Sequence, residues 1–197
     1  EQLDIRRTSV EGIELTRLRS LEHLRVLYMA HTPLSRLGAA ALGTLSHLEH
    51  LDLSHTSVAD GDLSHLTGMA ELQRLDLFHT SISDTGLSHL SSLKTLRRLD
   101  VHDTSVTDVG MAHLSGLEEL RELHISGTAV TDAGLKHLRG LSRLQELFIH
   151  RTALSPGAIN DFKKKWRTHA RDVLARGSEV AAPSDKQPKP RLSVFGP

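Results

Sequence analysis

The residues of this chain that could do chemistry are histidines and carboxylates at a fixed spacing. Three histidines lie 24 residues apart: His31, His55 and His79. Three aspartates have the same spacing: Asp52, Asp76 and Asp100. Imidazoles are common ligands of transition metals and titrate near neutral pH, and a carboxylate beside an imidazole can act in acid–base chemistry. Whether these residues act together depends on the elements that carry them.

The same spacing runs through most of the chain. Threonine recurs every 24 residues, at Thr8, Thr32, Thr56, Thr80, Thr104, Thr128 and Thr152. A leucine precedes each threonine by five residues, at Leu3, Leu27, Leu51, Leu75, Leu99, Leu123 and Leu147. No insertion or deletion interrupts these series, so the chain is a tandem repeat.

Each repeat is expected to contain a short strand and a short helix. Apolar and polar residues alternate over residues 75–77, which indicates a strand. Beyond Leu87 the apolar residues come at steps of three, which favours a short helix or a 3₁₀ turn. Asp84 comes directly before this helix and is expected to cap its free N–H groups. The equivalent aspartates are Asp60, Asp108 and Asp132.

This repeat resembles the leucine-rich repeat family. The matching residues are LxxLxLxxT over Leu72–Thr80 and T-D-x-G-L-x-H-L over Thr131–Leu138. The resemblance covers about residues 1–160 and implies an α/β fold, a curved right-handed solenoid with a parallel sheet on its concave face and short helices on its convex face. It also implies partner binding, mostly through the concave strands. Thr replaces the Asn of many members in the turn, and we expect its hydroxyl to serve the turn backbone.

Three segments are expected along the chain. Residues 1–155 form the solenoid of about seven units, and residues 156–176 form a C-terminal capping helix with Phe162 and Trp166 on its apolar side. Residues 177–197 form an extended tail rich in Pro and Lys, with three candidate anchors: Leu192, Val194 and Phe195. The tail either docks on the body or on a neighbour, or is a solvated linker. The sequence begins inside a repeat, which predicts an open N-terminal edge.

The histidine series have different expected environments. Neighbouring strands are about 4.8 Å apart, so His31, His55 and His79 could share a metal ion, although duplication of a repeat also produces such a row. On the convex side, neighbouring helices are about 8–10 Å apart, too far for imidazoles to share an ion. A shallow open face gives no pocket that excludes water. We therefore expect no catalytic residue, no metal site and no cofactor.

The concave face is interpreted as the partner-binding surface, because aromatic side chains among paired charges are typical of protein interfaces. Arg74 and Arg98 are expected to compensate the aspartates. The predicted contact residues are Tyr28, His31, Asp52, His55, Arg74, Asp76, Phe78, His79, Arg98, Asp100, His102 and Phe148.

The main hypothesis is a non-enzymatic module that binds a partner protein through this face. One alternative is an accessory subunit of a large assembly, which contacts neighbours through its N-terminal edge, convex face and tail. The other is a metal-dependent enzyme or binder that uses His31, His55 and His79.

Composition limits the partners. The chain has 24 Lys and Arg residues against 24 Asp and Glu, so bulk electrostatics argues against nucleic-acid binding. A basic patch on the expected last helix is interpreted as a charged helix face: Lys163, Lys164, Lys165 and Arg167. The lack of cysteine excludes disulfides and thiolate sites. No apolar run is long enough for a membrane span. We expect no small-molecule substrate, and a soluble protein that is intracellular or organellar rather than secreted.

Overall fold

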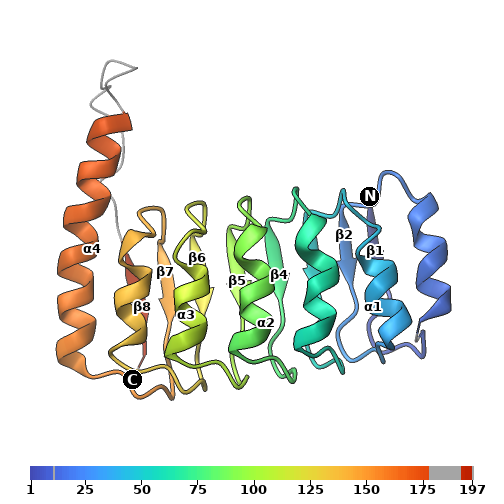
Figure 1. Cartoon of the computed structure of the whole chain (residues 1–197), viewed down its shortest axis with the longest axis horizontal. Coiled ribbons are helices and arrows are strands. Elements are labelled where there is room, and N and C mark those ends of the chain that lie inside the picture. The colour runs from blue at the N-terminus through green and yellow to red at the C-terminus, as the bar shows by residue number, and fades with distance from the viewer. Residues whose placement is uncertain (11, 178–191, 197) are drawn as a thin grey trace.

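The repeats build one open parallel sheet with a layer of helices along one side (Figure 1). The computed structural model describes residues 1–10, 12–177 and 192–196. The strands follow one another in chain order across the sheet. They are β1 (Gln2–Asp4), β2 (Val26–Tyr28), β3 (His50–Asp52), β4 (Arg74–Asp76), β5 (Arg98–Asp100), β6 (Glu122–His124), β7 (Glu146–Phe148) and β8 (Ser193–Phe195).

A helical segment follows each of the first seven strands. The α-helices are α1 (Arg36–Leu42), α2 (Asp84–His89), α3 (Asp108–Leu114) and α4 (Pro156–Gly177). The 3₁₀ helices are η1 (Ile13–Ser20), η2 (Asp60–Gly68), η3 (Leu90–Ser92) and η4 (Gly134–Gly140). In Figure 1 they stand in front of the strands as a single layer. The predicted alternation of short strands and short helices is therefore confirmed.

The constant repeat length sets the register of the sheet. Leu75 pairs with Leu99, and Asp76 pairs with Asp100, so each residue lies beside its counterpart in the next repeat. Leu75, Leu99 and Leu123 point away from solvent and are fully buried. Burial of one such side chain contributes about 1.5–3 kcal/mol. One continuous aliphatic core thus runs between the sheet and the helices.

The repeated threonines close the turn after each strand. The hydroxyl of Thr56 donates a hydrogen bond of 2.6 Å to the carbonyl oxygen of Leu53, and Thr128 donates to Ile125 over the same distance. The predicted service of these hydroxyls to the turn backbone is confirmed. In the second repeat the hydroxyl of Thr32 instead donates to Ile5 O of the preceding repeat at 2.8 Å.

The aspartates at the helix starts connect repeats, and the expectation that they cap their own helices is wrong. The carboxylate of Asp84 accepts hydrogen bonds from the backbone N–H and the hydroxyl of Thr107, at 2.8 and 2.6 Å. It also accepts one from Gly110 N–H at 2.9 Å. The cap of α2 is Ser83, whose hydroxyl accepts from Thr85 N–H. Stacking brings the N–H groups of the next repeat within reach of the carboxylate, which one repeat in isolation does not offer.

Helix α4 covers the last repeat at one end of the molecule (Figure 1). Phe162 and Trp166 are almost completely buried against the aliphatic core. The indole N–H of Trp166 donates a hydrogen bond of 2.7 Å to Leu141 O, so the one polar atom of this side chain has a partner.

The tail supplies an eighth strand, which is not predicted from the sequence. Val194 lies opposite Leu147 in parallel pairing. The backbone N–H of Ser193 donates to Gln145 O at 2.7 Å, and Ile149 N–H donates to Phe195 O at 2.8 Å. Leu192 is buried. Residues 192–196 thus dock on the chain's own body.

Replacement of Asp108 by Ala is expected to destabilise the protein. Asp108 accepts hydrogen bonds from the backbone N–H and the hydroxyl of Thr131 at 2.7 and 2.6 Å, and both bonds are partly buried. Loss of a hydrogen bond to a charged group costs about 1.5–3 kcal/mol, so urea unfolding should show a loss in that range. The matched control is Asp132→Ala, which breaks the same two bonds to exposed Ser155. Its loss should be smaller, and an equal loss would contradict the role of burial.

Replacement of Leu192 by Ala is expected to loosen β8. Truncation of a buried leucine costs roughly 2–5 kcal/mol, and here much of that loss should appear as local opening. Hydrogen exchange of the Ile149 amide, which bonds to Phe195 O, measures this opening directly. Leu37→Ala is the control, because Leu37 is 68% exposed. Unchanged protection of Ile149 in the Leu192 variant would show that β8 does not depend on this anchor.

Candidate functional site

The outer face of the sheet, called the sheet face below, carries three columns of residues that continue across the repeats. The strand column ends each strand: Asp4, Tyr28, Asp52, Asp76, Asp100, His124 and Phe148. The exit column comes two residues later: Arg6, Ala30, Ser54, Phe78, His102, Ser126 and His150. The turn column follows directly: Arg7, His31, His55, His79, Asp103, Gly127 and Arg151.

The turn column has a left-handed backbone in every repeat. Its φ angles lie between 52° and 66°, and Gly127 is its only glycine. A left-handed conformation costs a non-glycine residue roughly 1–2 kcal/mol. The other six positions bear that strain with Arg, His or Asp side chains. Strain of this kind is often retained where a side chain is needed for function, which directs attention to this column.

Aromatic and imidazole rings stack along the sheet face in three groups, called the ring stacks below. Neighbouring ring centroids are 3.9–4.6 Å apart, with interplanar angles of 12–21°. All of these rings are at least partly exposed. The ring stacks are His31–His55–His79, Phe78–His102 and His124–Phe148–Phe195.

The three histidines considered as a shared metal centre form one of these ring stacks instead. His31 and His55 are inclined by 13°, and His55 and His79 by 21°. The lone pair of an imidazole nitrogen lies in the plane of its ring, and nearly parallel planes do not meet at one ion. That ligand set is therefore wrong. Strand spacing correctly placed the rings side by side, but it did not specify their orientation.

Two of the predicted contact aspartates are buried. Asp76 is 4% exposed and Asp100 is 3% exposed. Arg74 Nε lies 2.8 Å from Asp76, and Arg98 bridges Asp76 and Asp100 at 3.4 and 3.6 Å. The predicted compensation by these arginines is confirmed. The buried carboxylates of Asp76 and Asp100 fix the positions of the two arginines and His102, and they offer little surface to a partner.

The N-terminal part of the sheet face contains an open depression of about 590 Å³. Asp52 lines it and is held by Ser54, whose backbone N–H and hydroxyl donate to Asp52 Oδ1 at 3.0 and 2.6 Å. Arg6 also lines it, and its guanidinium lies 5.2 Å from the centre of the Tyr28 ring. Hydrogen bonds from Arg6 lower the pKa of Asp4 to about 2, so this ion pair stays charged at neutral pH.

Two acidic residues of the sheet face, Glu122 and Asp103, are missing from the predicted contact set. Glu122 forms an ion pair with Arg98 and lies 2.7 Å from Nε2 of His124. Burial lowers the pKa of His124, although the nearby Asp100 opposes this effect. Asp103 succeeds His79 in the turn column, and Glu122 pairs with Arg98 across the sheet. Asp103 lies 24 residues after His79, and Glu122 lies 24 residues after Arg98, so the repeat period predicts that both residues lie on the sheet face.

Comparison with known families supplies the classification. A family model described as "Leucine-rich repeat region" matches residues 2–182. The chain belongs to the leucine-rich repeat family. Leucine-rich repeat proteins are typically non-enzymatic modules that bind protein partners. Among the helices that the structure describes, none combines the length and the apolar character needed to cross a membrane.

Two solved structures have a similar fold. Internalin C2 from Listeria monocytogenes is 21% identical, with a TM-score of 0.67 over 82% of this chain and 66% of that one. A TDR receptor is 18% identical, with a TM-score of 0.60 over 82% of this chain and 29% of the receptor. The chain thus spans only part of the length of either structure, and at these identities the likeness concerns the fold alone. A search of curated protein sequences gives no match.

The ring stack predicts an acid-shifted titration of His55. Loss of solvent around the ring lowers the pKa of His55 below 6.5, and the neighbouring His31, His79 and His102 lower it further because like charges repel. The folded state then binds fewer protons than the unfolded state, so this group weakens folding as the pH falls below about 6.5. NMR titration should give a His55 midpoint below 6.5, which rises in His31→Gln. His137→Gln on the helix side is the control, and a wild-type midpoint at or above 6.5 would contradict the effect.

Proposed function

We propose that this leucine-rich repeat protein binds another protein through its sheet face, with the ring stacks as the anchoring surface. The observation that carries the proposal is the run of partly exposed, stacked rings from β2 to β8. Aromatic side chains are enriched at protein interfaces and dominate their energetics. A partner that covers this surface would bury apolar ring area on both sides of the contact.

Rigidity supports this role. Each stacked ring is confined by its neighbours, and the underlying strands are held by backbone hydrogen bonds such as Leu77 N–H to Asp100 O at 2.8 Å. Little additional side-chain entropy is therefore lost when a partner covers these rings. Eight strands at about 4.8 Å give a surface roughly 34 Å long, enough for an interface of ordinary size.

The charges support selectivity. The centre of the sheet face has an internally paired network, in which Arg98 contacts Asp76, Asp100 and Glu122. Such a network gives the partner little net charge to neutralise. The rim has more exposed charges, including Arg151, whose side chain is 71% exposed. Stacked rings and internally paired charges at the centre, with exposed charges at the rim, fit the usual arrangement of a protein interface.

A binding role fits this surface better than catalysis. The depression beside Arg6 and His31 is open to solvent, so a reacting group there would stay hydrated and weakly polarised. The buried carboxylates at the centre already have arginine and histidine partners. We therefore infer a non-enzymatic module, with recognition as its activity.

The test is paired replacement on the two faces. Phe78→Ala with His55→Ala removes rings from two ring stacks, and the matched helix-side variant is Val109→Ala with His137→Ala. Partners captured by the wild-type protein should bind at least about tenfold more weakly to the sheet-face variant, because an interface anchor is worth more than about 1.4 kcal/mol. The helix-side variant should bind normally, and circular dichroism should show both variants folded.

A different result would favour the assembly role. If partners are lost from the helix-side variant, or from a chain that ends at Gly177, while the sheet-face variant binds normally, recognition is not on the ring stacks. In that case the helix layer or the tail makes the contacts. Surface plasmon resonance with the identified partner measures each affinity separately.

A further inference from the structure

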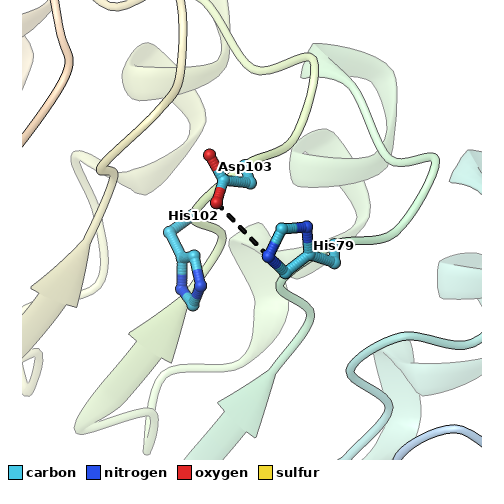
Figure 2. Close-up of side chains that lie close together, drawn as sticks. All are labelled: His79, His102 and Asp103. Carbon is cyan, nitrogen blue, oxygen red and sulfur yellow. Dashed lines mark ion pairs between the residues drawn. The ribbon is translucent and has the colours of Figure 1, made fainter.

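A group of three potential metal ligands lies at the centre of the sheet face, formed by His79, His102 and Asp103 (Figure 2). One donor atom from each residue lies within 4.8 Å of the other two. We infer that these three residues bind a divalent transition-metal ion of the zinc class, with coordination positions left open to solvent. No metal site is expected from the sequence, in which the histidines weighed as shared ligands are His31, His55 and His79.

The rings in this group have an orientation that a shared ion requires. His79 and His102 are inclined by 77°, with ring centroids 5.4 Å apart. Their planes therefore intersect, unlike those of the stacked His31 and His55. Figure 2 shows the carboxylate of Asp103 above the two rings, with one oxygen directed at His79. His79 Nε2 lies 3.3 Å from Asp103 Oδ2. Two ligand atoms at this separation can both reach one zinc ion, whose bonds to nitrogen and oxygen are about 2 Å long.

A buried carboxylate orients one of the ligands. His102 Nδ1 lies 2.6 Å from Asp100 Oδ1, and Asp100 is 3% exposed. This bond places the ring proton on Nδ1 and leaves the lone pair of Nε2 free. Metal-binding histidines in proteins usually have such a partner, which sets the tautomer and raises the basicity of the ring. Asp100 thus acts as a positioning residue for His102.

The side chain of Asp103, the third ligand, occupies space that a glycine leaves free. Gly127 occupies the turn column in the repeat after Asp103, and a Cβ at Gly127 would collide with Asp103 Oδ1. The single glycine of the column therefore stands where the carboxylate needs room. The side chain of His79 is 46% exposed, so an ion can enter from solvent on that side.

Two imidazoles and one carboxylate favour zinc and its neighbours over calcium or magnesium, which prefer oxygen ligands. One group opposes the ion. Arg151 Nη2 lies 2.7 and 2.8 Å from the two oxygens of Asp103, and it competes for that carboxylate. The ion and Arg151 should therefore exclude each other, and Arg151, being largely exposed, can move away into solvent.

The experiment uses the whole chain and zinc chloride alone, so its result is independent of the partner proposed above. Isothermal titration should give one saturable site, and the cobalt-substituted protein should show the absorption bands of a low-symmetry site. His79→Gln, His102→Gln and Asp103→Asn should each weaken zinc binding by at least tenfold. Asp100→Asn should weaken it by roughly 10–100-fold through the orientation of His102.

The controls separate this site from the other histidines. His137→Gln removes an imidazole from η4 on the helix side, away from the three ligands, and it should leave zinc affinity within about twofold of wild type. Arg151→Gln should tighten binding, because the competing cation is gone. Urea unfolding without zinc identifies any variant that fails to fold. Failure to bind zinc, or equal affinity in the His79, His102 and wild-type proteins, would overturn the inference, as would weaker binding in Arg151→Gln.

Discussion

The structure depends on the parallel pairing of identical positions in successive repeats. Because every unit has the same length, the strands pair in register and place each residue beside its counterpart. Neighbouring strands in a sheet are about 4.8 Å apart. Each core leucine packs against the equivalent leucine of the next repeat, and this contact excludes water. The same rule brings like charges and rings together on the outer face. The chemistry of the sheet face follows from the contacts that these neighbouring charges and rings make with one another.

Two kinds of accommodation are visible. Asp76 and Asp100 are adjacent carboxylates that would repel each other. Arg98 contacts both, so negative and positive groups alternate and the repulsion is offset. The histidines are accommodated as stacked rings, and loss of solvent together with repulsion from the neighbouring imidazoles lowers the pKa of His55. The aspartates at the helix starts use the same proximity in another way, since each one binds the N–H groups of the following repeat. Repeat contacts are thus polar at the edges of the core and apolar within it.

The sequence predicted what depends on period alone. Strand positions, the leucine core, the threonine hydrogen bonds and the arginine partners of Asp76 follow from spacing and side-chain chemistry. Features that depend on orientation were beyond it: the stacking of His31 on His55, and the convergence of His79 with His102 and Asp103. Strand β8 was also beyond it, because the offset between Val194 and its partner Leu147 is no multiple of the repeat length. The helix α4 intervenes, and no periodic signal connects the two strands.

Strand β8 covers the edge of β7 at one end of the sheet. An uncovered strand edge offers unpaired N–H and C=O groups to any passing chain, and natural proteins usually protect such edges. Here the protection of β7 comes from residues 193–195, which pair with it in parallel. Separation of β8 from the sheet would leave the pairing of β1 to β7 intact. It would make β7 the edge strand and open its N–H and C=O groups to pairing with another chain, a second copy of the protein included.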